Sequence, residues 1–195
     1  MGPTIRQCPF GAPALLDGAA NRLVCVERIL VSACLLGSRV RYDGGAKRVD
    51  DQLLERWRDE GRLVSFCPEV SGGLPVPRPP AEIVGSGSSA DGAAVLDGTA
   101  QVVTESGTDV TESFVRGARL AVEAARRSGA RLAILKEGSP SCGSHRIYDG
   151  TFSGTPTPGV GVTTALLERA GVRVFGEDEL QSAAAYLEEL EARQR

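Results

Sequence analysis

Short apolar runs alternate with helical segments along most of this chain, and the alternation constrains the fold more than any other feature. Four runs have the length and apolar content of buried strands: residues 28–33, 63–66, 132–135 and 172–175. Four segments have helical periodicity or composition: residues 50–60, 108–128, 162–170 and those beyond 177. Strands joined by helices favour right-handed crossovers and a parallel sheet. The sequence therefore predicts one α/β domain over residues 28–195, a Rossmann-like three-layer arrangement with a mainly parallel sheet covered by helices on both faces.

Three segments fall outside this alternation. Residues 1–27 contain prolines and glycines without periodicity and are expected to form an N-terminal extension that is loosely attached to the domain. Residues 74–80 are too rich in proline for a helix or a central strand. Residues 85–99 consist mainly of glycine, serine, alanine and aspartate, which is typical of a surface loop or hairpin.

The charge pattern and the absence of long apolar stretches narrow the class of partner. The 22 basic and 25 acidic residues are interleaved and give a net charge of −3, which argues against binding to a nucleic-acid polymer. No apolar run approaches the roughly 20 residues that span a bilayer, so no membrane partner is expected. The first 27 residues lack a secretory pattern, and we therefore expect a cytoplasmic protein.

Three of the five cysteines follow predicted strands. Cys34 and Cys67 come directly after the first two strands, and Cys142 lies a few residues beyond the third. Because ligands bind beyond the carboxyl ends of parallel strands, these three positions are expected to meet at one edge of the sheet. Disulfides are rare in the cytoplasm, so metal binding or catalysis is the expected use. Cys8 and Cys25 lie in the extension and are read as structural or exposed thiols.

Three chemistries are open to such a set of thiols. An iron–sulfur cluster accepts thiolates from dispersed loops. A zinc site is the second option, with His145, the only histidine, as fourth ligand, although zinc usually takes paired ligands from tight turns. The third is a nucleophilic Cys142 that His145 or a helix N-terminus activates. Spacing alone leaves the three open.

Six sequence blocks between residues 28 and 178 narrow the choice: SACLLG (32–37), RYDGG (41–45), CPEVSGGL (67–74), PRPPAE (77–82), LK with SPSCG (135–136 and 139–143) and YDGTFSG (148–154). In this order they resemble the signature of the thiouracil desulfidase (desulfurase) family, a bacterial family long catalogued as a domain of unknown function. The resemblance implies that three cysteines hold a [4Fe–4S] cluster with one iron not ligated by the protein: Cys34, Cys67 and Cys142. It also implies a catalytic glutamate and serine: Glu69, and Ser139 in preference to Ser141.

The activity that the resemblance implies is removal of sulfur from a thiolated uracil (2- or 4-thiouracil or its nucleotide), which yields uracil and sulfide by non-redox hydrolysis. Soft iron would take the thiocarbonyl sulfur, and Glu69, relayed through Ser139, would deprotonate the attacking water. Arg41 and Arg78 are expected to contact substrate oxygens or a phosphate, and Tyr42 to stack on the pyrimidine. The alternative is a zinc-structured or iron–sulfur sensor or binding domain without catalysis.

Overall fold

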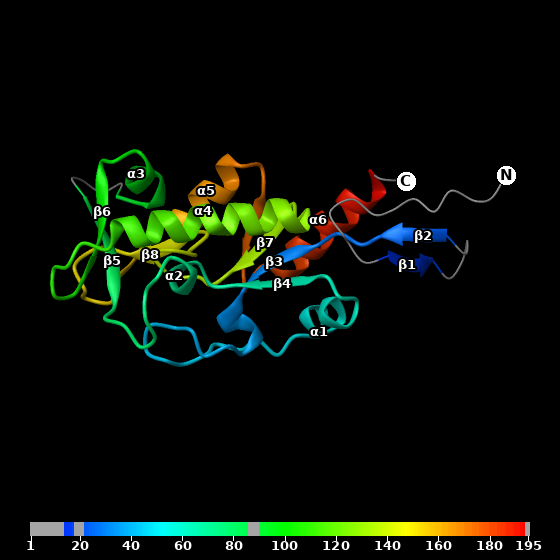
Figure 1. Cartoon of the computed structure of the whole chain (residues 1–195), viewed down its shortest axis with the longest axis horizontal. Coiled ribbons are helices and arrows are strands. Elements are labelled where there is room, and N and C mark those ends of the chain that lie inside the picture. Colours follow the sequence, from blue (N-terminus) through cyan, green and yellow to red (C-terminus); the bar gives the residue numbers. More distant parts are fainter. Residues whose placement is uncertain (1–13, 18–21, 86–89, 194–195) are drawn as a thin grey trace.

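A four-stranded parallel sheet lies at the centre of the computed structural model (Figure 1). The structure describes residues 14–17, 22–85 and 90–193. The strands, in their order across the sheet, are β10 (Arg173–Gly176), β7 (Leu132–Leu135), β3 (Ile29–Ser32) and β4 (Leu63–Phe66). All four correspond to the predicted apolar runs, and each neighbouring pair is parallel.

Successive residues of β3 point to opposite sides of the sheet, as the period of two in a strand requires. Ile29 and Val31 pack in one cluster with residues of α1 (Gln52–Asp59) and α6 (Leu180–Ala192). Leu30 packs in another cluster with residues of α4 (Thr111–Ser128) and α5 (Val162–Arg169). The prediction of a mixed α/β domain with a parallel sheet flanked by helices is therefore confirmed. Its finer description as a Rossmann-like three-layer domain stays a prediction.

Local signals account for the helix boundaries. Asp51 precedes α1, and its side chain accepts a hydrogen bond of 2.7 Å from the backbone N–H of Leu53. On the buried side of this helix, Leu54 and Trp57 are fully excluded from solvent. Helix α4 stops at Gly129, which has a left-handed φ of 71°.

A second group of elements packs beside the N-terminal half of α4 (Figure 1). It contains the antiparallel pair β5 (Ala81–Gly85) and β6 (Ala100–Thr104), the short helix α3 (Gly92–Leu96), and the antiparallel pair β8 (Arg146–Tyr148) and β9 (Pro156–Pro158). The loop or hairpin predicted over residues 85–99 is therefore wrong in part. Residues 92–96 are helical because Asp91 accepts hydrogen bonds from the N–H groups of Ala93 and Ala94, while residues 86–89 lie outside the described chain.

The described residues of the predicted N-terminal extension include an antiparallel pair, β1 (Ala14–Asp17) and β2 (Arg22–Cys25). Residues 1–13 and 18–21, and with them Cys8, lie outside the described residues. The loose attachment expected of this segment therefore stays a prediction. Within the described part of the chain, no helix is both long enough and apolar enough to cross a membrane.

Candidate active site

The three predicted cysteines lie where strands of the central sheet end. Cys34 is in a short 3-10 helix, η2 (Ala33–Leu36), directly after β3. Cys67 is the residue before α2 (Pro68–Ser71), directly after β4, and Cys142 lies in the loop after β7. All three thiols are free and line one cavity of about 540 Å³. The parallel topology thus brings together three positions that are far apart in sequence.

Burial dominates the electrostatics of these thiols. It raises the pKa of Cys34 from 9.0 to about 11, with a further contribution from neighbouring Cys67. Burial also raises the pKa of Cys142, where the negative charge of Glu69 adds to the effect, and the pKa of Cys67. The raised pKa values keep these thiols protonated. Because a metal ligand must be a thiolate, metal binding displaces their protons.

Helix α2, which follows Cys67 and carries Glu69, is held by close backbone contact with α4. A Cβ atom on Gly117 of α4 would lie 2.1 Å from the carbonyl oxygen of Pro68, and one on Gly72 would lie 2.2 Å from that of Ser113. No side chain fits at either position. The two glycines therefore allow α2 to lie against α4 closely enough to fix its place at the end of β4.

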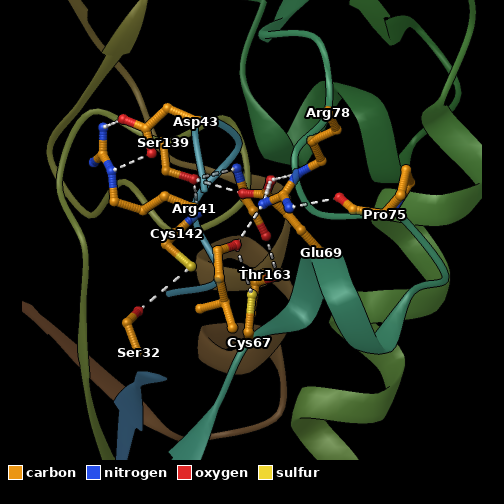
Figure 2. Close-up of polar contacts among 12 residues, drawn as sticks. Ser32, Arg41, Asp43, Cys67, Glu69, Pro75, Arg78, Ser139, Cys142 and Thr163 are labelled. Carbon is orange, nitrogen blue, oxygen red and sulfur yellow. Dashed lines mark hydrogen bonds and ion pairs between the residues drawn. The ribbon is translucent and has the colours of Figure 1, made fainter. Parts of the chain in front are cut away.

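Glu69 is the centre of the polar network beside the cysteines (Figure 2). Arg78 donates to its Oε2 oxygen from Nε at 2.9 Å and from Nη2 at 2.6 Å. The Oε1 oxygen accepts a hydrogen bond of 3.3 Å from Ser139 Oγ. The structure therefore brings together the predicted glutamate and serine, and it adds an arginine that orients the carboxylate.

The two candidate serines have different surroundings. Ser139 Oγ accepts hydrogen bonds from the N–H groups of Ser141 at 3.1 Å and of Cys142 at 3.2 Å, and it lines the cavity. Ser141 is fully buried, and its Oγ lies 2.9 Å from Thr163 Oγ1. Only Ser139 contacts Glu69, which favours it over Ser141 as the partner of the glutamate.

A buried carboxylate holds the loop that carries Cys142. Glu137 is 4% exposed and accepts hydrogen bonds from the N–H groups of Ser144 at 3.0 Å, His145 at 3.0 Å and Arg146 at 3.2 Å, and from the Ser144 hydroxyl. Its own N–H donates to Glu177 at 2.6 Å. Sequence reasoning missed this role, because a glutamate in a loop has no pattern that marks it as buried.

Ser32 contacts Cys142 directly. It is 2% exposed, at the end of β3, and its Oγ lies 3.6 Å from Cys142 Sγ (Figure 2). Because the same Oγ accepts from the N–H of Lys136 at 3.1 Å, its hydroxyl proton is available for the sulfur. Hydrogen bonds to ligand sulfur tune iron–sulfur sites. The position of Ser32 in the SACLLG block is the sequence signal that could have found it.

The three predicted substrate contacts all line the cavity, but they differ in exposure and in hydrogen-bond partners. Arg41 donates to Asp43 from Nε at 3.2 Å and from Nη2 at 3.0 Å, and its guanidinium lies 5.4 Å from the centre of the Tyr42 ring. Tyr42 is 43% exposed. The side chain of Arg78 is only 5% exposed and also donates to the carbonyl oxygens of Pro75 and Val40, so its donors are directed at the protein.

The chemistry of the donor set distinguishes a cluster from a zinc ion. His145 does not line the cavity; its side chain is 61% exposed and its Nε2 lies 2.7 Å from Glu179. Among the described residues, no three His, Cys, Asp or Glu side chains are placed to hold one metal ion. Zinc needs its ligands to converge on one point, whereas a cluster takes each thiolate on a different iron. Three separate thiols around one cavity therefore fit a cluster, whereas His145 lies outside that cavity with its ring against Glu179.

Comparison with known proteins decides the family. The model of the family described as 2-thiouracil desulfurase matches residues 29–179, nearly all of the predicted domain. The chain belongs to this family. The family match begins at β3 and ends just before α6, so it includes all the cavity residues named above.

Two relatives support the family assignment. The chain is 49% identical over 152 residues to the uncharacterized protein YbbK of Bacillus subtilis strain 168, a match that covers 78% of this chain and 97% of that protein. It is similar to the solved structure of the [4Fe-4S]-dependent thiouracil desulfidase TudS, with a TM-score of 0.75 and 52% identity over 83% of this chain and 98% of that one.

Proposed function

We propose that this protein is a [4Fe–4S]-dependent desulfidase that removes sulfur from a thiolated uracil (2- or 4-thiouracil or its nucleotide) and yields uracil and sulfide by non-redox hydrolysis. One observation carries the proposal: three free thiols from three strand ends line the same cavity as a glutamate and a serine that hydrogen-bond to each other. Membership of the 2-thiouracil desulfurase family supports it, as does the similarity to a [4Fe-4S]-dependent thiouracil desulfidase.

The three thiols would hold the cluster, one iron each, through Cys34, Cys67 and Cys142. A [4Fe–4S] cluster has four irons, so three protein ligands leave one iron free for the substrate. When bound, the cluster would supply a soft Lewis acid that takes the thiocarbonyl sulfur and makes the adjoining ring carbon more electrophilic. No carboxylate or imidazole is needed as a fourth ligand.

Glu69 is the proposed general base. Arg78 holds its Oε2 oxygen, so Oε1 is the oxygen that faces Ser139 and can take a proton from water. The water oxygen attacks the ring carbon, the carbon–sulfur bond breaks, and the protons of the water pass to Glu69 and to the leaving sulfide. Ser139 keeps the carboxylate in place, because its Oγ is itself fixed by the N–H groups of Ser141 and Cys142.

Substrate recognition is assigned to Tyr42 and Arg41, which line the cavity. Tyr42 can stack on the pyrimidine, because its ring is partly exposed at the cavity. Arg41 can contact substrate oxygens once its pairing with Asp43 is shared or exchanged. Arg78 was predicted for the same task, but its guanidinium is used by Glu69, Pro75 and Val40, and we propose a positioning role for it instead.

The wider setting of the reaction follows from the same reasoning. We place it in the cytoplasm, where thiols stay reduced and available to iron. We assign it to one domain over residues 28–195 with the Rossmann-like three-layer arrangement predicted above, and residues 1–27 to a separate extension. The substrate is a small molecule, and neither a nucleic-acid polymer nor a membrane takes part.

The proposal is tested by anaerobic reconstitution with iron and sulfide, followed by measurement of sulfide release from 2-thiouracil, 4-thiouracil and 4-thiouridine monophosphate. We expect a brown protein that releases sulfide from at least one of them. Glu69→Gln should keep the brown colour and lose activity by at least about a hundredfold, in the range of general acid–base catalysis. Each of Cys34→Ser, Cys67→Ser and Cys142→Ser should lose both.

Two results would overturn the proposal. A colourless protein that retains stoichiometric zinc would favour the zinc-structured domain. A brown protein that releases no sulfide from any thiolated pyrimidine, or one in which Glu69→Gln changes no measured property, would favour a cluster sensor without catalysis. If activity survives Cys34→Ser and Cys67→Ser and is lost only in Cys142→Ser, the cysteine is a nucleophile instead.

A further inference from the structure

Three glutamates with substantially buried side chains line the cavity, and they differ in how their oxygens are used: Glu69, Glu82 and Glu137. The carboxylate of Glu69 is held by Arg78 and Ser139, and that of Glu137 accepts from four donors. Glu82 in β5 is 7% exposed and accepts one hydrogen bond, of 3.0 Å, from the N–H of Phe152 to Oε2. Over the described ranges of the chain, no cation pairs with it and no second donor contacts it.

Such a carboxylate has unused acceptor capacity. An ionised carboxyl group offers about four acceptor positions, and burying them without partners costs free energy. The neighbouring Ile83 is 2% exposed and packs in the cluster formed with Val102 and Phe114. Because side chains alternate along a strand, Glu82 projects to the other side of β5, toward the cavity that it lines.

The one donor that Glu82 has belongs to a backbone in an unusual conformation. Phe152 has a φ of 58°, a left-handed conformation that residues other than glycine rarely adopt, and it too lines the cavity. Such positions persist where the surroundings enforce them, and they are frequent at ligand sites. The hydrogen bond from Phe152 thus fixes one oxygen of Glu82 and leaves the other at the cavity wall.

We propose that Glu82 is a substrate-recognition residue whose carboxylate accepts a hydrogen bond from a neutral N–H or O–H donor of the substrate. The inference rests on the proposed function, since it assigns a role at the same cavity. Two groups of a thiolated pyrimidine substrate carry such a donor: the ring N–H and the hydroxyls of an attached sugar. A phosphate is disfavoured at this wall, because the negative charge of Glu82 repels it.

The test begins with Glu82→Gln in the reconstituted protein. The amide oxygen of glutamine still accepts from the N–H of Phe152, so the loop stays anchored, while the amide NH₂ presents donors where the substrate needs an acceptor. We expect KM for sulfide release to rise about tenfold or more with little change in kcat or in melting temperature. Glu105→Gln is the matched control, because it removes the same charge from an exposed glutamate of the same cavity. It should change KM less than about twofold.

Analogues that lack a donor identify its source. The ring arm compares 4-thiouracil with its N1-methyl and N3-methyl derivatives, and the sugar arm compares 4-thiouridine with 2′-deoxy-4-thiouridine. In the wild-type protein, KM should be higher for the analogue that lacks the recognised donor than for the parent substrate. The factor should be about the one by which Glu82→Gln raises KM for the parent substrate. For the same analogue, Glu82→Gln should not raise KM any further, because the two changes remove the same hydrogen bond.

Failure of this inference differs from failure of the proposed function. If the wild-type protein is active but Glu82→Gln leaves KM unchanged, or if every analogue loses as much in the variant as in the wild type, Glu82 does not recognise the substrate. If the wild-type protein releases no sulfide, the proposed function fails. The inference is then tested by binding of uracil and uridine, which keep the same donors. Equal dissociation constants for wild type and Glu82→Gln would overturn it.

Discussion

Two segments carry the cavity's catalytic candidates, and they are held by different forces. The α2 segment (residues 67–73) brings Cys67 and Glu69 and is fixed by backbone packed against the backbone of α4. The Cys142 loop (residues 136–146) brings Ser139 and Cys142. Its N–H groups donate to one buried carboxylate, that of Glu137, and its backbone also contacts the start of α5, where the N–H of Gly161 donates to Gly143. The first segment therefore depends on a steric contact with α4, and the second depends on a buried carboxylate in addition to its backbone contacts with α5.

This difference predicts which substitutions each segment tolerates. A steric contact between backbones fails when any atom is added, whatever its polarity. A carboxylate that serves several N–H groups fails when its oxygens are removed, whatever the volume of the new side chain. The Ser139–Glu69 hydrogen bond of 3.3 Å joins the two segments and couples their positions.

The largest expected effect is on the Cys142 loop. Glu137→Ala removes the acceptor for the N–H groups of Ser144, His145 and Arg146, and unpaired buried donors cost about 1–3 kcal/mol each. Since some of them will find water, we expect the free energy of unfolding to fall by about 3 kcal/mol in a urea titration. Glu137→Gln keeps one acceptor oxygen and should lose roughly half as much. A loss below about 1 kcal/mol for Glu137→Ala would mean that the carboxylate does not hold the loop.

Gly117→Ala tests the α2 segment. Alanine normally stabilises a helix relative to glycine by about 1 kcal/mol. Here its Cβ would lie 2.1 Å from the carbonyl oxygen of Pro68, so α2 must move. We expect a net loss of about 2 kcal/mol in the free energy of unfolding, the usual cost of overpacking, and reduced sulfide release because Glu69 moves with α2.

The control for Gly117→Ala is Arg119→Ala on the exposed side of the same helix, which should stay within about 0.5 kcal/mol of the wild type. If Gly117→Ala stabilises the protein instead, the segment is not sterically fixed and the comparison between the two segments fails.

The sequence predicts the central sheet well, and the reason is physical. Runs such as residues 132–135 are buried on both sides and contain only apolar residues, so their pattern reports their environment directly. The parallel order then places Cys34 and Cys67 at one edge without further information. Glu69 and its serine partner came from the family resemblance, since a lone glutamate after a strand has many ordinary uses.

The outer elements were missed because their signals are weak or contradictory. Residues 156–158 contain two prolines, which argue against a strand except at an edge, and β9 pairs only with β8 in its sheet. Gly117 reads as a weak point of a helix, although it permits the contact on which α2 depends. Arg78 was read as a substrate contact because a sequence does not show that its guanidinium is already occupied.

A smaller effect is expected at the contact between Ser32 and Cys142. A substitution there tests both the stability of the free protein and the retention of a bound cluster. Ser32→Ala removes the donor to Cys142 Sγ and the acceptor for the N–H of Lys136. We expect about 1 kcal/mol less stability in the free protein, the usual worth of one hydrogen bond. In the reconstituted protein, iron should be lost to a chelator about tenfold faster, since partners of metal ligands tune affinity.

Ser141→Ala is the matched control, because it removes a buried hydroxyl that contacts Thr163 and no sulfur. Equal rates of iron loss from Ser32→Ala and Ser141→Ala would show that the hydrogen bond to Cys142 has no part in holding the cluster.

The smallest expected effect distinguishes the two segments by pH. His145 lies near the end of the Cys142 loop, and its hydrogen bond to Glu179 raises the pKa of His145 above its ordinary value of 6.5. A raised folded-state pKa contributes stability that is fully present below about pH 6.5 and is lost as the pH rises through the raised pKa. Because the side chain is 61% exposed, the contribution should not exceed about 0.5 kcal/mol at low salt. Urea titrations of His145→Gln and the wild type should therefore differ at pH 5.5 and coincide at pH 9.

The loss of stability caused by Gly117→Ala should be the same at both pH values, because a clash between an added methyl group and a backbone carbonyl binds no proton. If the effect of Gly117→Ala followed the pH and that of His145→Gln did not, the division into a sterically held and an electrostatically held segment would be wrong.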